Sequence, residues 1–154
     1  MMTWWSLPFV LQGLLLAIDE IIFHRRRGLG WWERLGHPLD TLSVAATQGY
    51  LLLYPLGPSG DATQNSDRLM IYLGICTFSC LLVTKDEWIH SKECPPTENW
   101  LHSLLFILHP ITLGVSGWLS YSQTHLELIP LIFGSLIFTA AAQLIYWGLI
   151  HDRQ

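Results

Sequence analysis

Residues 86–109 read DEWIHSKECPPTENWLHSLLFILH, a run of acids and histidines that leads directly into an apolar segment. A similar run occurs earlier in the chain, at 19–40, where the sequence is DEIIFHRRRGLGWWERLGHPLD. Each run starts with an acid pair and a histidine, crosses a short connection, and ends with a glutamate and a histidine at the start of another apolar segment. The two runs therefore predict two helical hairpins of the same kind.

The composition of the chain is that of a membrane protein. Of its 154 residues, 51% are hydrophobic, only 13% are charged and eight are tryptophan, a residue that prefers the membrane interface. The net charge of −4 comes without a long basic run, which argues against a nucleic-acid partner. This length corresponds to about one domain, so we expect 1–154 to form a single membrane domain.

Five segments are long and apolar enough to be predicted as transmembrane helices, which need about 20 residues. They are 4–24, 39–57, 68–90, 100–120 and 126–150. The first segment lacks the basic start and the small-residue cleavage site of a signal peptide, so we interpret it as a membrane helix. The predicted fold is an all-α integral membrane protein in which 4–57 and 68–120 are tandem-repeat hairpins and 126–150 is an extra fifth helix.

The distribution of basic residues predicts the orientation of these helices. Only Arg68 falls on one side of the predicted membrane, and the other seven of the eight basic residues fall on the opposite side. These seven are Arg25, Arg26, Arg27, Arg34, Lys85, Lys92 and Arg153. Positive charge marks the cytoplasmic side, so we expect the N-terminus outside, the C-terminus in the cytoplasm, and a multi-pass protein of the inner membrane of a prokaryote.

The two acid- and histidine-rich runs predict a metal site on the cytoplasmic face. Residues three or four apart share a face of a helix, so the carboxylates and imidazoles of each run stack in pairs. The predicted ligands are Glu20, His24, Glu33, His37, Glu87, His90, Glu98 and His102. Helical bundles hold pairs of metal ions with such sets. We therefore expect two metal ions, with iron favoured and with zinc or manganese compatible with the same ligands.

Four further residues could support the site as extra ligands or as hydrogen-bond partners of the ligands. They are Asp19, Asp40, Asp86 and His109. The segment HPLDTLSV at 37–44 resembles HPITLGV at 109–115, so either His102 or His109 is the counterpart of His37. Gly36 and Pro38 interrupt the helical pattern around Glu33, which leaves Glu33 and Asp40 open as ligands.

The ligand set resembles that of membrane-bound di-iron carboxylate and histidine proteins, such as alternative oxidases and the membrane hydroxylases and desaturases. The resemblance is limited to ligand chemistry: the histidine boxes of desaturases are missing, and the spacing Glu-x-x-His occurs at Glu87–His90. It implies a di-iron oxidoreductase or hydroxylase that acts on a lipophilic small molecule at the cytoplasmic membrane face.

Several other functions and partners fit the same sequence. A zinc-dependent membrane hydrolase would use the same ligands to activate water. A metal or proton transporter predicts ionisable residues across the whole membrane, and the outer halves of the predicted helices have few. A haem-binding membrane subunit would use facing histidines and leave the glutamates without a role. The expected partners are the lipid bilayer and a lipophilic substrate, with a second copy or a larger membrane complex as an alternative.

Overall fold

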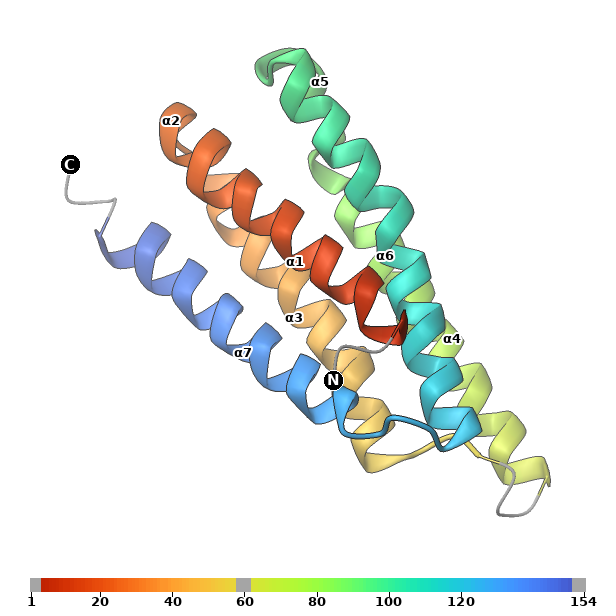
Figure 1. Ribbon diagram of the computed structural model, residues 1–154. Helices are drawn as coiled ribbons and strands as arrows, with labels where there is room; N and C mark the ends of the chain where they lie inside the picture. Colours follow the sequence, from red (N-terminus) through yellow and green to blue (C-terminus); the bar gives the residue numbers. More distant parts are fainter. Residues whose placement is uncertain (1–3, 58–61, 151–154) are drawn as a thin grey trace.

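The computed structural model describes residues 4–57 and 62–150, apart from the side chains of residues 86, 88, 149 and 150. In these ranges the chain is helical and contains no strand, which confirms the all-α prediction. The long helices lie side by side in an elongated bundle (Figure 1).

The first hairpin joins a composite helix to a continuous one. The composite helix starts with a 3-10 turn and α1, widens into a π-helical segment and ends in the short α2. Its parts are Trp4–Ser6, Leu7–Ile18 (α1), Asp19–His24 and Arg25–Arg27 (α2). The return helix is α3, Trp31–Leu53.

The second hairpin has the same order of parts but a different local geometry. Helix α4, Ala62–Leu82, passes through a 3-10 turn at Val83–Asp86 into α5, Glu87–Glu93. The return helix is α6, Pro96–Ser122. The last helix, α7, covers Leu128–Ile145 and continues as a π-helical segment, Tyr146–Ile150.

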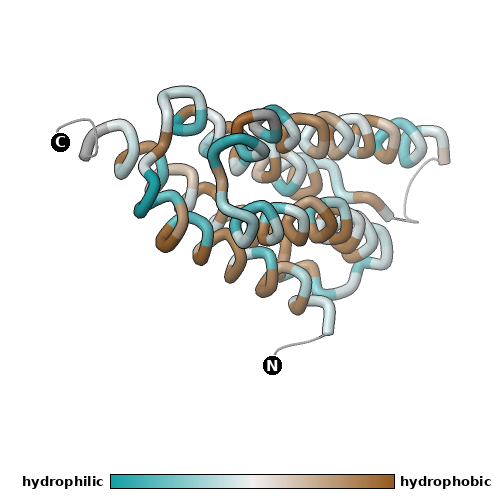
Figure 2. The backbone as a smooth tube through the Cα atoms, turned by 90° about the horizontal axis from the view of Figure 1, so that it is seen from above, coloured by the Kyte–Doolittle hydropathy of each residue, from teal (hydrophilic) through white to brown (hydrophobic). Residues whose placement is uncertain are grey.

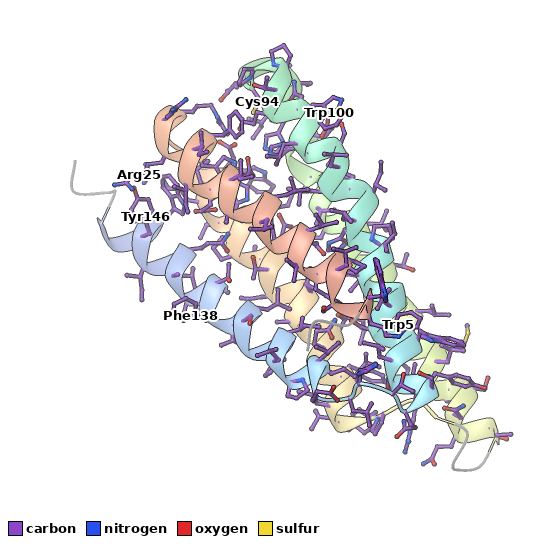
Figure 3. All side chains as sticks on the ribbon, in the orientation of Figure 1. Trp5, Arg25, Cys94, Trp100, Phe138 and Tyr146 are labelled. Carbon is purple, nitrogen blue, oxygen red and sulfur yellow. The ribbon has the colours of Figure 1, made fainter. Side chains whose placement is uncertain are left out.

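Four helices are long and apolar enough to cross a membrane, which indicates a multi-pass membrane protein. They are Trp4–Arg27, Ala62–Glu93, Pro96–Ser122 and Leu128–Gly148. They contain or closely match the segments predicted at 4–24, 68–90, 100–120 and 126–150. Large apolar side chains are exposed along them, among them Phe138, which is 76% exposed (Figure 3). Hydrophobic residues run along most of the helical turns in Figure 2, as contact with a lipid bilayer requires.

Helix α3 differs from the predicted second span, 39–57. It starts at Trp31 and ends at Leu53, and its mean hydropathy is below that of the four helices that could cross a membrane. Helix α3 packs against α4, α6 and α7 and buries polar side chains against them, including Thr47 and Gln48. A helix in the centre of a bundle can carry such residues because they face protein and not lipid. The fifth span, the orientation and the tandem repeat stay predictions.

The predicted interruption of α3 at Gly36 and Pro38 does not occur, because the helix is continuous from Trp31. Pro38 is buried inside it and removes one backbone donor. Bundled helices tolerate proline when neighbouring groups satisfy the freed carbonyl. Glu33 and His37 therefore lie on one helix. The bends of the two hairpins, at α2 and α5, lie at the same end of the bundle (Figure 1).

Candidate metal centre

Four buried side chains meet at the end of the bundle that carries α2 and α5. Asp19 and His24 come from the π-helical segment, and Glu98 and His102 come from the first two turns of α6. One ligand atom from each residue lies within 4.8 Å of all the others. We name these four residues the Asp19–His102 cluster. Two imidazoles and two carboxylates at this separation could hold a metal ion.

Asp19 lies between the two histidines of the cluster. Its Oδ2 is 3.2 Å from Nε2 of His24, and both of its carboxylate oxygens are 3.1 Å from Nε2 of His102. Glu98 approaches from the other side, with Oε1 at 3.8 Å from Nε2 of His24. The negative charge of the two acids therefore surrounds the imidazole nitrogens that a metal ion would use.

The π-helical segment determines which acid belongs to the cluster. A regular α-helix would place Glu20 under His24, four residues later. The wider π-helical turn, with its i→i+5 hydrogen bonds, directs Asp19 towards His24. Glu20 remains 3.7 Å from Nδ1 of His24. Its carboxylate accepts hydrogen bonds from the side-chain amide of Gln143 on α7, at 3.2 Å, and from the indole N–H of Trp147 in the π-helical segment that follows α7.

The histidines at this end of the bundle carry buried ring nitrogens without hydrogen-bond partners. These atoms are Nδ1 and Nε2 of His24, Nδ1 and Nε2 of His90, Nε2 of His37, and Nδ1 of His102. Nε2 of His24 approaches two carboxylates without an aligned hydrogen bond. Buried polar atoms are nearly always satisfied in proteins, because leaving one unpaired costs about 1–3 kcal/mol. Coordination of a metal would satisfy these nitrogens, so the residues present fit an ion.

His37 and His90 extend the cluster on its two sides. The ring centroids of His24 and His37 are 4.4 Å apart, and those of His90 and His102 are 4.1 Å apart. Nε2 of His90 lies 3.6 Å from Oε1 of Glu33. The histidine before each bend thus approaches the glutamate after the bend of the other hairpin: His24 meets Glu98 and His90 meets Glu33.

Arg27 provides a positive charge inside this group of acids. Its guanidinium binds Glu33 through two bonds of 2.7 and 3.1 Å, and it lies 3.4 Å from Glu98. Burial by itself raises the pKa of Glu33, but His90, Arg27 and the backbone N–H of Gly30 outweigh burial and hold that pKa well below its usual range. Glu33 is therefore ionised and already neutralised by Arg27.

Cys94 is a further residue of this region and lies outside the predicted ligand set. It lies near the bend at α5 (Figure 3), and its thiol donates a hydrogen bond to Oε1 of Glu98 at 3.1 Å. Burial raises the pKa of Cys94 to about 12, so it stays a thiol. Cys94 lies before α6, which starts at Pro96, so the helical period of the sequence gave no signal for this contact.

The remaining predicted residues lie outside the cluster. Glu87 is exposed, and the side chain of Asp86 is outside the described part of the structure. Asp40 pairs with Lys85 at 2.6 Å. His109 belongs to a separate buried network, with Nε2 at 3.0 Å from Ser79 and Nδ1 at 3.4 Å from the amide of Gln12. His102, and not His109, therefore lies in the cluster.

A cavity of about 580 Å³ starts at the cluster and extends into the bundle between α1, α3, α6 and α7. Asp19, Glu20, His37, His90 and His102 line its polar end. Further along, the lining side chains are mainly apolar. They include Phe9, Val10, Leu16, Leu105, Phe106, Leu131 and Leu136. An apolar molecule in this cavity would lie directly beside the candidate metal site.

Comparisons with known proteins do not assign a family to this chain. No protein-family model matches it, and neither curated proteins nor solved structures gave a match.

Proposed function

We propose that this protein is a metal-dependent membrane oxidoreductase or hydroxylase, with a di-iron centre, that acts on a lipophilic molecule at the cytoplasmic membrane face. One observation carries the proposal: buried carboxylates and unpaired imidazole nitrogens lie together at the polar end of an apolar cavity. A metal site and a lipophilic site that share a boundary are what a reaction on an apolar substrate needs.

The Asp19–His102 cluster would hold one metal ion. The ligands of a second ion would come from the predicted residues beside it, which are Glu20, Glu33, His37 and His90. Glu33 is now paired with Arg27, so a second ion would compete with the guanidinium for this carboxylate. With two irons bound, such a centre supplies activation of dioxygen, using electrons from an external donor. The protein orients the histidines, neutralises the acids and excludes water from the buried ligands.

The ligand count of the cluster favours one alternative, a zinc-dependent membrane hydrolase. Zinc takes four nitrogen, oxygen or sulfur ligands, and Asp19, His24, Glu98 and His102 are four such groups. A catalytic zinc site keeps one position open for water, so one of the four would have to leave or share its place.

Metal analysis of the purified protein tests the proposal. We expect two irons per chain in protein purified in detergent, and we expect His24→Ala and His102→Ala to lose the metal. His125→Ala is the matched control, because this half-buried histidine lies in the loop after α6 and its side chain pairs only with Glu127 among the described contacts. One zinc per chain would support the hydrolase. A Soret band in the optical spectrum would indicate haem, and folded protein without bound metal would refute a metal-dependent function.

A further inference from the structure

We infer that the cavity binds a single-chain lipid with a small uncharged polar head, such as an alcohol or a quinol. In this arrangement the head lies against the Asp19–His102 cluster and the chain follows α1 into the membrane. Such a lipid would be the substrate of the proposed enzyme, and this role rests on the proposed function. The binding itself can be measured on protein without metal.

The length of the cavity fits an extended hydrocarbon chain. Its lining residues on the first, composite helix extend from Ser6 to Ile21. With a rise of 1.5 Å per residue, this distance is about 22 Å. A cavity of this length, with a volume of about 580 Å³, has room for an extended chain that follows α1.

The charge at the polar end selects the head group. Asp19 and Glu20 line this end beside the imidazoles of three histidines, and Asp40, which also lines it, is paired with Lys85. These histidines are His37, His90 and His102. In protein without metal, the formal negative charge of the carboxylates repels a carboxylate or phosphate head. A hydroxyl group carries no charge and can donate a hydrogen bond to a carboxylate.

The chain by itself gives little selectivity within a membrane, because the surrounding lipid tails are as apolar as the cavity wall. Two features of the cavity must therefore distinguish substrates: the contacts of the head and the length available to the chain. The polar end lies at the end of the bundle that carries α2 and α5, so the head and its first carbons are next to the candidate metal site (Figure 1). On the proposed function, the reaction takes place at these positions and not at the far end of the chain.

Gly13 offers a way to shorten the cavity without disturbing the cluster. It lines the cavity, and a Cβ atom added to it would meet nothing within 4 Å. Gly13 lies six residues before Asp19, or about 9 Å along the helix. Gly13→Leu should therefore block long chains and leave the polar end open. Gly114→Leu is the matched control, because Gly114 also has open space around it and does not line the cavity.

The experiment measures binding to detergent-purified, chelator-treated protein by native mass spectrometry and by the shift in Tm. The probes are 1-hexadecanol, palmitate and 1-hexanol. We expect one hexadecanol per wild-type chain, at least tenfold weaker binding of palmitate, and at least tenfold weaker binding of hexadecanol to Gly13→Leu. The Gly114→Leu variant should bind hexadecanol as the wild type does. The affinities of the wild type and of Gly13→Leu for hexanol should differ by less than twofold.

Equal binding of hexadecanol to wild type and Gly13→Leu would overturn the inference, and so would tighter binding of palmitate or occupancy by phospholipid alone. If Gly13→Leu does not fold, Ser135→Phe on α7, at another residue that lines the cavity, replaces it as the blocking variant. Metal content is measured on the same preparations before the chelator is added. Lipid binding without metal would refute the proposed function alone, and metal without lipid binding would refute this inference alone.

Discussion

Asp19 contacts two imidazoles at once, those of His24 and His102, and only 4% of its surface is exposed. In a metal-bound protein such a carboxylate either coordinates the ion or orients the histidines that do. Both roles need its negative charge in this position. Glu87, which the spacing Glu-x-x-His made an equal candidate, is instead exposed at the start of α5.

Asp19→Asn and Glu87→Gln test this difference directly. We expect Asp19→Asn to lower metal affinity by about 10- to 100-fold, because it removes a charge that two histidines share. Glu87→Gln, which also exchanges a carboxylate for an amide, should leave the affinity within twofold of the wild type. The measurement is metal retained against a competing chelator. Equal losses in the two variants would show that Glu87 moves into the site when metal binds.

Arg27 stabilises the acids of the centre in the absence of a metal. Arg27→Gln would leave Glu33 buried without its cation, which costs about 3–5 kcal/mol for a fully buried pair. We expect about 3 kcal/mol, because the Arg27 side chain is 18% exposed. Chemical unfolding of metal-free protein measures this change. Arg26→Gln, at an exposed arginine next to it, is the control and should change the stability by less than 0.5 kcal/mol.

The same pair predicts a dependence on pH. The pKa of Glu33 is lower in the folded protein than its unfolded value of about 4.3. Its contribution to stability is therefore complete above that unfolded value and is lost as the pH falls towards the folded one. The difference in unfolding free energy between wild type and Arg27→Gln should shrink in acid and stay constant between about pH 6 and 8. A difference that grows in acid would contradict the ionised state of Glu33.

At the scale of elements, the last helix contributes to the centre through two residues outside the predicted ligand set. Trp147 is fully buried and its indole N–H donates to Glu20, while Gln143 binds the other oxygen of the same carboxylate. Trp147 is the second residue of its π-helical segment, and Glu20 is the second residue of the π-helical segment in the first helix. Contact between two such segments holds the end of α7 against the first helix.

Trp147→Phe tests this contact by removing the donor and keeping an aromatic ring. We expect a loss of about 1–2 kcal/mol, the value of a strong hydrogen bond between membrane helices. Trp118→Phe is the matched control, because Trp118 is 52% exposed and should tolerate the change. Thermal unfolding of both variants in the same detergent decides the comparison. No difference between them would show that α7 is held by its other contacts.

The network of His109 joins four helices deeper in the bundle. His109 on α6 contacts Ser79 on α4, which in turn contacts Ser43 on α3 at 2.7 Å, and the other ring nitrogen faces Gln12 on α1. Because both ring nitrogens have partners, this histidine is satisfied without a metal. We expect His109→Leu to lower the Tm of the protein and to leave metal content unchanged, whereas His102→Ala should remove the metal. Loss of metal from His109→Leu would contradict the separation of the two sites.

Much of this architecture follows from composition and hydropathy, and the exceptions have local causes. The apolar segments predict the all-α fold and the four helices that could cross a membrane. Helix α3 does not match its predicted span because its polar side chains face neighbouring helices. The recurring acids and histidines predict which end of the bundle carries a site. A π-helical turn sets the direction of Asp19, and the 3-10 turn before Glu87 sets the direction of Glu87. The α-helical period of 3.6 residues, on which the prediction relied, describes neither turn.

At the scale of the whole molecule, the orientation in the membrane is a direct prediction from the basic residues. In a variant with its three cysteines replaced by serine, a membrane-impermeant maleimide should label His125→Cys in intact cells. Lys92→Cys should react only after the membrane is opened. These positions lie after α6 and near the end of α5, at opposite ends of the bundle (Figure 1). The reverse pattern of labelling would place the candidate metal centre outside the cytoplasm.

The presence of Arg27 among the acids has a consequence for how the protein is assembled. An uncompensated cluster of buried carboxylates would oppose insertion into the bilayer, where charges are costly. Because the guanidinium is part of the same chain, this compensation is available as soon as the first hairpin is made. The bundle can then form during synthesis without waiting for an ion, and cofactor loading becomes a later and separate step in the maturation of the protein.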